Sequence, residues 1–510
     1  MKIIIPLGGE DKEIKNEFFK IKPLVTLGKE TMIETFIKKF QFKNEYIFLC
    51  RQHDLINTDL LSVLKKLKIK KKIVPIEIDT SNVISTIKYA EKYLKNNESL
   101  LICHPDSINY FESLTEVREK LFKSKLDGYV FSFDEESHTN TIESQTGRVI
   151  IKKNKILKIN EKSIQTNDSQ ILTGMYFFKR WDEFKKYSKL TLQNQSPVQG
   201  RYFISQIYNE YLRNKKKLGI IKIKKHITFG LIPYIKEYNF WFDYFKFNIK
   251  KKLSIKNNFL NLVPSCGDGL RFKVNNRNNF KPLIKVNKEF MILKALRSLP
   301  KSNNNVVIMR SDHNKKFSFK KKIIKNFKKL DTLILKNKTD GMASTCYEYL
   351  KNHDVKTPII ISSCDYSVIY NEEKFLNLLK FFNPDVVVWT FKKYPDARIA
   401  PFAYAYCEIK NGKINRISEK TPISNTPHLD HIAQGIFYFK SKDIFLKAYK
   451  NMIEKKDKIN NEYYVANSIN ELINQKYKVL PFEVDQYICL GTIQDLKVYN
   501  FWSEYFYDKI

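Results

Sequence analysis

A glycine-rich segment followed by two cationic residues lies near the middle of the chain, in residues 261–286. A short apolar run leads to Gly267 and Gly269, and Arg271 and Lys281 follow. Glycine permits positive φ and a close approach of the backbone to a ligand. Arginine binds phosphate oxygens through bidentate hydrogen bonds, whereas lysine supplies a point charge. The spacing therefore predicts a phosphate-binding turn after a strand, with Arg271 and Lys281 neutralising the phosphates.

A single aspartate ends the apolar run of residues 358–364. If that run is a parallel strand, Asp365 lies at the carboxyl edge of the sheet, where such sheets bind their ligands. A hard carboxylate oxygen suits Mg²⁺ that bridges the phosphates of a nucleotide. We predict Asp365 as a magnesium ligand; the alternative is that it only caps a strand end.

The elements that position these residues alternate between strands and helices in the first 110 residues. The strands are expected at residues 2–7, 46–50, 72–78 and 100–103, and the helices at residues 32–40, 60–67 and 81–94. Alternation at these lengths predicts an α/β fold of three layers with a mostly parallel sheet.

The second half of the chain repeats the first. The residue pairs that recur 259 positions apart include Lys22 and Lys281, Arg51 and Arg310, Thr80 and Thr339, and Asp106 and Asp365. Chance does not produce so many matches in the same order, so we predict a tandem duplication of one domain. The expected domains are residues 1–250 and 259–510, joined by the lysine-rich residues 250–258.

The order G-x-G-x-R, a short variable loop and K-P-L resembles the signature of the sugar-1-phosphate nucleotidyltransferases, or nucleoside-diphosphate-sugar pyrophosphorylases. In this chain Gly267, Gly269, Arg271 and Lys281 carry it. The resemblance implies a Rossmann-like nucleotide-diphospho-sugar transferase domain (GT-A-like) in each half. It also implies Mg²⁺-dependent transfer of a nucleoside monophosphate from a nucleoside triphosphate to a sugar 1-phosphate, with release of pyrophosphate. Arg271 would bind the departing pyrophosphate, Lys281 would steady phosphate charge in the transition state, and Asp365 would hold the metal.

The resemblance gives roles to further positions in the second half. Gly341 would let the nucleobase pack on the backbone, although its segment also fits an ordinary helix N-terminus. Glu419 and Lys420 would bind the sugar hydroxyls and the sugar phosphate, or else form an exposed ion pair of little energetic value. Gly435 would leave room for the sugar ring. Asp485 is the candidate for a second metal carboxylate, although the family's aspartate usually stands closer to the C-terminal Gly-Thr pair.

The first half departs from the motif at the positions that would bind phosphate. Asp11 stands where the second half has Gly269, and Glu13 stands where it has Arg271. A carboxylate in place of the arginine repels a triphosphate. We therefore predict that the first half keeps the fold but has lost triphosphate binding, and that it serves as a partner or senses a ligand. The pocket residues that it keeps are Lys22, Asp106, Glu161 and Lys162.

The composition restricts the partners. The formal net charge of +36 would suit nucleic acid, but lysines spread along the whole chain without a basic motif favour a general compositional bias. No apolar stretch approaches the length of a membrane span, and the N-terminus lacks the pattern of a signal peptide. The seven cysteines show no CxxC spacing, which predicts neither zinc nor disulfides. We expect a cytoplasmic protein. Its two halves could form a pseudo-dimer, or the chain could assemble into a homo-oligomer.

The sequence leaves three hypotheses about the function. A nucleotidyltransferase that makes an activated sugar for surface polysaccharide is the preferred one, with the base and the sugar undetermined. A GT-A-type glycosyltransferase would bind metal through D-x-D, whereas Asp365 stands alone. A non-catalytic nucleotide or sugar-phosphate sensor would result if both copies had decayed.

Overall fold

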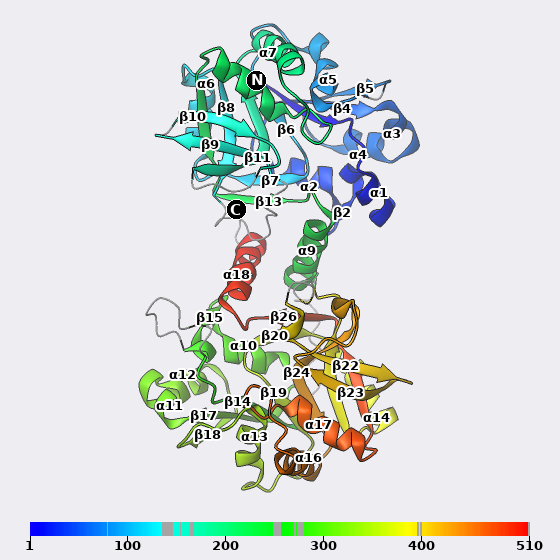
Figure 1. Cartoon of the computed structure of the whole chain (residues 1–510), viewed down its shortest axis with the longest axis vertical. Coiled ribbons are helices and arrows are strands. Elements are labelled where there is room, and N and C mark those ends of the chain that lie inside the picture. Colours follow the sequence, from blue (N-terminus) through cyan, green and yellow to red (C-terminus); the bar gives the residue numbers. More distant parts are fainter. Residues whose placement is uncertain are drawn as a thin grey trace. The chain divides into compact units, whose positions relative to one another are not determined.

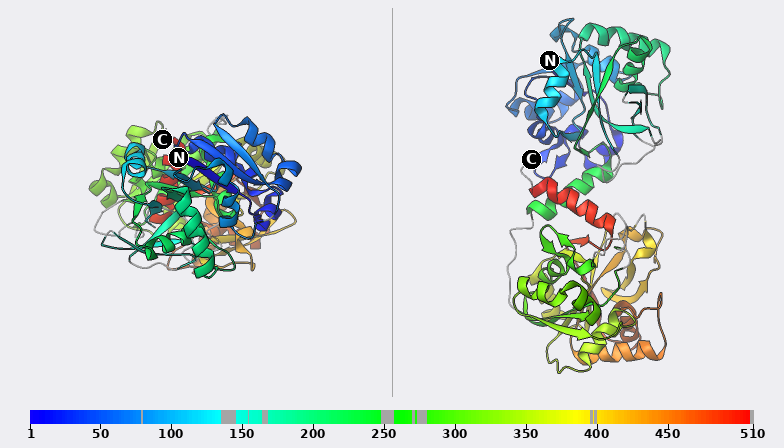
Figure 2. Two further views of the ribbon diagram at one scale, coloured as in Figure 1. Left: turned by 90° about the horizontal axis from the view of Figure 1, so that it is seen from above. Right: turned by 90° about the vertical axis from the view of Figure 1, so that its left-hand side faces the viewer.

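The structure, a computed structural model, describes most of the chain. The described residues are 1–78, 80–134, 146–153, 155–163, 168–247, 257–269, 272, 280–394, 397 and 400–507. The chain divides into two compact units, Met1–Asp243 and Tyr244–Ile510, and each is a sheet flanked by helices (Figure 1, Figure 2). In the predicted linker, residues 250–256 lie outside the described residues, and residues 257–258 begin a strand of the second unit.

The sheet of the second unit is mixed, with one reversed strand. Across the sheet the order is β18 (Leu330–Leu335), β17 (Ser302–Arg310), β14 (Asn257–Ser265), β19 (Ile359–Ser362), β24 (His431–Phe439), β21 (Val386–Phe391) and β25 (Val479–Glu483). Strand β24 is antiparallel to β19 and β21, whereas the other pairings in this order are parallel. Beside β24 lies the hairpin β22 (Ala405–Lys410) and β23 (Lys413–Glu419), and β20 (Tyr366–Ile369) pairs separately with β26 (Gln486–Cys489).

The sheet of the first unit has the same order and the same reversed position. Its strands are β5 (Lys71–Ile76), β4 (Glu45–Arg51), β1 (Lys2–Leu7), β6 (Leu100–Cys103), β11 (Ser169–Phe178), β8 (Gly128–Phe133) and β12 (Leu218–Lys222). Strand β11 is the reversed one. The hairpin β9 (Arg148–Lys152) and β10 (Lys155–Asn160) corresponds to β22 and β23, and the pair β7 (Ser107–Tyr110) and β13 (Lys225–Thr228) corresponds to β20 and β26. This agreement supports the tandem duplication.

Helices cover both faces of each sheet. Those of the first unit are α1 (Lys12–Phe18), α2 (Met32–Lys39), α3 (Gln52–Asn57), α4 (Leu60–Lys66), α5 (Val83–Lys88), α6 (Leu114–Lys123), α7 (Trp181–Asn194), α8 (Ile207–Arg213) and α9 (Ile232–Phe242). Those of the second unit are α10 (Met291–Ser298), α11 (Ser311–Phe317), α12 (Phe319–Asn326), α13 (Met342–Leu350), α14 (Glu372–Phe382), α16 (Lys442–Glu454), α17 (Val465–Asn474) and α18 (Ile493–Tyr507). None of the described helices is long and apolar enough to cross a membrane.

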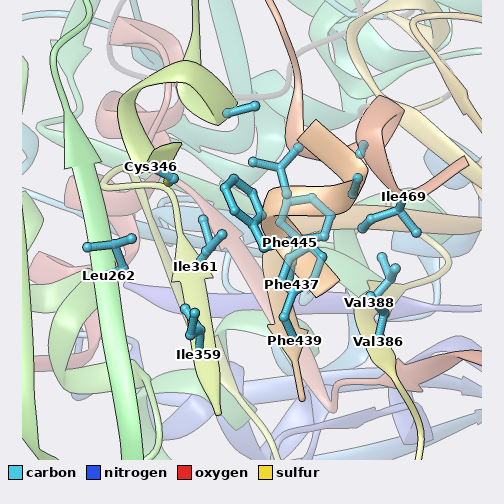
Figure 3. Close-up of a cluster of buried hydrophobic side chains, with 14 of the residues drawn as sticks. Leu262, Cys346, Ile359, Ile361, Val386, Val388, Phe437, Phe439, Phe445 and Ile469 are labelled. Atoms are coloured by element: carbon cyan, nitrogen blue, oxygen red, sulfur yellow. The ribbon is translucent and has the colours of Figure 1, made fainter. Parts of the chain in front are cut away.

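Successive strand residues pack on opposite faces of the second sheet. Leu262 lies in a cluster with side chains of α13, α16 and α17, whereas its neighbour Val263 lies in a cluster with side chains of α10, α12 and α14. Figure 3 shows the first cluster, in which Leu262, Ile361 and Val388 share one face with Phe445 of α16. Strands buried on both faces are typical of parallel α/β sheets. The predicted three-layer α/β class is confirmed.

The repeat extends to individual hydrogen bonds. Asn209 of α8 accepts from the backbone N–H of Ile159 and donates to its carbonyl, both at 2.9 Å. Asn470 of α17 makes the same pair of bonds with Ile417, at 2.8 and 2.9 Å. In both units an asparagine thus fixes the outer hairpin on its helix.

Candidate active site

The glycine-rich turn follows β14 directly and is held by two cations. Gly269 has φ +60°, a conformation that disfavours side chains. Between the glycines, the Asp268 carboxylate pairs with Arg310 at the end of β17 at 2.5 Å and with Lys338 at 2.6 Å. The hydrogen bond from Lys338 outweighs burial and lowers the pKa of Asp268 to about 2. The turn is therefore fixed by a carboxylate that stays ionised.

Lys281 lies next to this turn, whereas Arg271 lies outside the described residues. Lys281 opens the 3-10 turn Lys281–Leu283, and a Cβ added at Gly269 would lie 3.4 Å from the Lys281 Cβ. The Lys281 ammonium lies 5.5 Å from the centre of the buried Phe272 ring. An apolar wall on one side and the bare glycine on the other direct the lysine toward the edge of the sheet.

Lys281 and Asp365 form an ion pair, with Nζ and Oδ2 2.6 Å apart. Asp365 follows β19, and the Ser363 hydroxyl donates to its Oδ1 at 2.7 Å. Burial acts to raise the pKa of Asp365, but the Lys281 charge outweighs it and holds that pKa below its usual value. Burial likewise acts to lower the pKa of Lys281, and Asp365 overcomes it and raises that pKa. Both groups are therefore charged at neutral pH, 84 residues apart in sequence.

Asp365 fits a magnesium ion held partly by substrate. Mg²⁺ is commonly bound by one or two carboxylates together with substrate phosphates, and Asp365 supplies one. Among the described residues, no group of three or more His, Cys, Asp or Glu side chains could hold a metal.

The predicted second carboxylate, Asp485, does not join Asp365. β20 and β26 pair from Tyr366 with Cys489 to Ile369 with Gln486, so Asp365 and Asp485 lie at opposite ends of this ladder. At the rise of a strand, the five residues between their positions correspond to about 17 Å. We therefore do not propose Asp485 as a ligand of the same ion.

A different carboxylate, Asp495, lies closer to Asp365. A Cβ added at Gly491 would lie 3.1 Å from Asp365 Oδ2 and 3.9 Å from Asp495 Oδ2. Asp495 Oδ2 accepts from the Thr492 N–H and hydroxyl, both at 2.7 Å, and thereby caps the start of α18. Our sequence analysis missed Asp495, although Thr492 and an acidic residue three positions later are the signal of such a cap.

Gly341 is required by packing against another loop. It has φ +113° at the start of α13, and a Cβ there would lie 2.7 Å from the backbone N and O of Tyr463. The flanking backbone forms two hydrogen bonds with Tyr463. The Ala343 N–H donates to the Tyr463 carbonyl at 3.1 Å, and the Tyr463 N–H donates to the Asp340 carbonyl at 2.7 Å. The structure thus gives Gly341 a role in packing that is independent of a nucleobase.

Glu419, Lys420 and Gly435 belong to the outer hairpin and to the strand beside it: Ala405 pairs with Glu419 on one side and with Ala433 of β24 on the other. Glu419 ends β23 with a buried side chain, and burial raises the pKa of its carboxyl group although Lys420, 3.7 Å away, opposes this. Gly435 has φ +84° at an irregularity of β24, and its carbonyl accepts from the Ser363 N–H at 3.2 Å. A Cβ at Gly435 would lie 3.5 Å from the Ser363 hydroxyl. The glycine therefore keeps the edge beside Asp365 open.

The family of the second unit follows from comparison with known proteins. Residues 261–502 match the protein-family model described as nucleotidyl transferase. This part of the chain is a nucleotidyl transferase domain. The match confirms the predicted family and the predicted class of enzyme. It contains the Gly267–Gly269 turn, Lys281 and Asp365.

Several solved structures are similar to about half of this chain. One is a nucleoside-diphosphate-sugar pyrophosphorylase from Vibrio cholerae RC9, with 17% identity, 47% of this chain and 99% of that chain covered, and a TM-score of 0.39. Another is the inositol-1-phosphate CTP transferase from T. maritima, with 12% identity, 48% and 96% covered, and a TM-score of 0.38. No curated protein matches the chain.

In the first unit, Glu161 takes the place of Glu419 of the nucleotidyl transferase domain. Burial raises the pKa of Glu161 to about 7, although the Ser205 hydroxyl donates to its carboxylate. A raised carboxyl pKa means that the folded state holds a proton that the unfolded chain has already lost. The contribution of Glu161 to the stability of the fold is therefore fully present below the unfolded pKa and is lost as pH rises through about 7.

We expect Glu161→Gln to remove this pH dependence. At pH 8 the variant should be more stable than the wild type by about 2 kcal/mol, and at pH 4.5 the two should be nearly equal, because glutamine carries no charge to desolvate. Thermal unfolding across this range measures it. Equal gains at both pH values would contradict the assignment of the effect to the Glu161 charge.

Proposed function

We propose that the second unit transfers a nucleoside monophosphate from a nucleoside triphosphate to a sugar 1-phosphate or a similar phosphorylated building block, and releases pyrophosphate. The observation that supports this most is the Lys281–Asp365 ion pair at 2.6 Å, beside the Gly267–Gly269 turn. A cation, a carboxylate and bare backbone at one edge of the sheet are what a polyphosphate and its metal require. The product would be an activated sugar for surface polysaccharide.

The reaction needs no covalent nucleophile on the protein. A phosphate oxygen of the sugar 1-phosphate attacks the α-phosphorus in line, and the bond from that phosphorus to the bridging oxygen of pyrophosphate breaks. Lys281 binds a phosphate oxygen and stabilises the charge that develops on it, and Arg271 binds the departing pyrophosphate. Mg²⁺ bound through Asp365 would supply further charge neutralisation on the phosphates.

The acceptor lies on the side of Glu419 in this proposal. Glu419 accepts hydrogen bonds from sugar hydroxyls, Lys420 holds the sugar phosphate, and Gly435 gives space to the ring. The base packs near Gly341 at the start of α13. Orientation of the two substrates, rather than acid–base chemistry, then provides much of the rate enhancement.

A pyrophosphate-release screen tests this function. The full chain is incubated with Mg²⁺, one of ATP, CTP, GTP, UTP or dTTP, and a panel of sugar 1-phosphates. We expect release with one pair of substrates, dependent on both. Release with a triphosphate alone would indicate hydrolysis and contradict the proposal. No release with any pair would also contradict it and would favour the non-catalytic sensor.

A further inference from the structure

The first unit contains a cavity of about 840 Å³ at the carboxyl edge of its sheet. This volume lies in the range of small-molecule sites. The charged side chains that line it are Glu10, Asp11, Lys22, Arg51, Asp106, Glu161, Lys162 and Arg201. A cavity of this size with a charged and polar lining can take a small polar ligand.

One end of this cavity is occupied by the chain's own carboxylate. Asp11, which replaces Gly269, accepts from the Ile14 N–H at 3.1 Å, and its other oxygen lies 3.6 Å from Lys22 Nζ. Lys22 also pairs with Asp106 at 2.8 Å. Burial opposes the charge on Lys22, but the two carboxylates outweigh it and raise its pKa. The lysine is thus already neutralised by two carboxylates, and this end repels a triphosphate.

Another part of the cavity lining carries a cation that the second unit lacks at the equivalent position. Arg201 forms an isolated bridge with Val198, and the equivalent bridge of the second unit joins Glu462 with Ile459. Arginine in the first unit therefore stands where the second unit has a carboxylate. The Arg201 side chain is exposed, and within the described part of the chain no carboxylate lies within 4 Å of its guanidinium. Lys162 and Glu161 line the same cavity.

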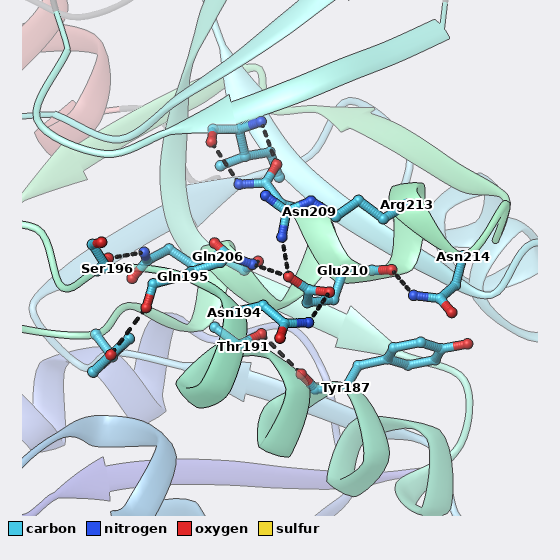
Figure 4. A network of polar contacts seen from close by, with 12 residues as sticks. Tyr187, Thr191, Asn194, Gln195, Ser196, Gln206, Asn209, Glu210, Arg213 and Asn214 are labelled. Atoms are coloured by element: carbon cyan, nitrogen blue, oxygen red, sulfur yellow. Dashed lines mark hydrogen bonds and ion pairs between the residues drawn. The ribbon is translucent and has the colours of Figure 1, made fainter.

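The loop that carries Arg201 is fixed in place. Figure 4 shows Gln195 and Gln206 closing it: the Gln195 side chain donates to the Gln206 carbonyl at 3.0 Å, and the Gln206 side chain donates to the Ser196 carbonyl at 3.2 Å. Gln195 also donates at 2.8 Å to Glu210, which is buried. A loop held at both ends needs little further ordering of its backbone when a ligand binds the arginine.

We propose that the first unit binds a sugar monophosphate and excludes nucleoside triphosphates. The phosphate contacts Arg201 and Lys162, because a guanidinium matches phosphate oxygens in pairs. The sugar hydroxyls donate to Glu161. The second unit has its own substrates, so this site goes beyond the proposed transfer reaction and does not depend on it.

Hydrogen exchange on the full chain tests the site. The probes are the 1-phosphates of glucose, galactose, mannose and N-acetylglucosamine, with inorganic phosphate and UTP as comparisons. We expect at least one sugar phosphate to protect residues 195–206, and UTP to leave them unchanged. Protection of residues 413–419 and pyrophosphate release report the second unit separately, so the two proposals can fail independently.

Charge reversal supplies the matched control. Arg201→Glu introduces the residue type of the second unit at an exposed position. We expect it to raise the apparent Kd for the sugar phosphate, measured from the protection, at least tenfold. Arg118→Glu on α6 makes the same charge change away from the cavity and should leave it unchanged. No protection by any sugar phosphate, protection by UTP, or equal binding by Arg201→Glu would overturn the proposal. Equal protection by inorganic phosphate alone would also overturn it, because the sugar would then contribute nothing.

Discussion

Lys281→Ala is expected to lower turnover in the pyrophosphate-release assay by about 100- to 1,000-fold, the loss usual for a charged group aimed at a transition state. The Lys281 ammonium lies 2.6 Å from Asp365 and beside the glycine turn, where phosphate charge would develop. The effect should fall on kcat more than on KM, because the interaction strengthens as the charge forms. Steady-state kinetics with the substrate pair found in the screen measures it.

The control is an ion pair of equal length outside the site. Lys455 and Glu471 in the same unit are also 2.6 Å apart, so Lys455→Ala removes a comparable salt bridge. We expect it to change turnover less than twofold. Thermal unfolding should show that Lys281→Ala remains folded, since Asp365 keeps the Ser363 hydrogen bond and access to water. Similar turnover in both variants would remove Lys281 from the proposed mechanism.

Gly341→Ala is expected to destabilise the second unit by about 3 kcal/mol. Two causes add: φ is +113°, and the new Cβ would lie 2.7 Å from the Tyr463 backbone, which cannot move aside as a side chain could. The melting temperature of the second unit should fall accordingly. Differential scanning calorimetry of the full chain measures it.

Gly412→Ala separates the two causes. Gly412 in the same unit has φ +71° and nothing within 4 Å of an added Cβ, so its substitution introduces only the backbone strain, about 1 kcal/mol. Equal losses in the two variants would show that the Tyr463 contact does not matter. If Gly341→Ala also weakens triphosphate binding at a temperature where it is folded, the proposed place for the base gains support.

Much of the fold could be predicted because it depends on local patterns. The first strand lies at residues 2–7 as expected, since its apolar run needs no partner to be recognised. The helix expected at residues 81–94 is wrong in extent: α5 ends at Lys88 and a 3-10 turn, Glu91–Tyr93, follows. The reversed strands β11 and β24 were not predicted, because strand direction depends on pairing across the sheet and not on local pattern.

The sequence by itself determined the duplication, the family and the unequal state of the two copies. All three conclusions rest on the spacing of residues, and the sequence alone shows that Asp11 stands at the position of Gly269. Only the tertiary structure brought Lys281 to Asp365, set Tyr463 against Gly341 and placed Asp485 at the far end of a ladder. The reason is physical: contacts between distant residues follow from strand register and loop packing, which short-range spacing does not encode.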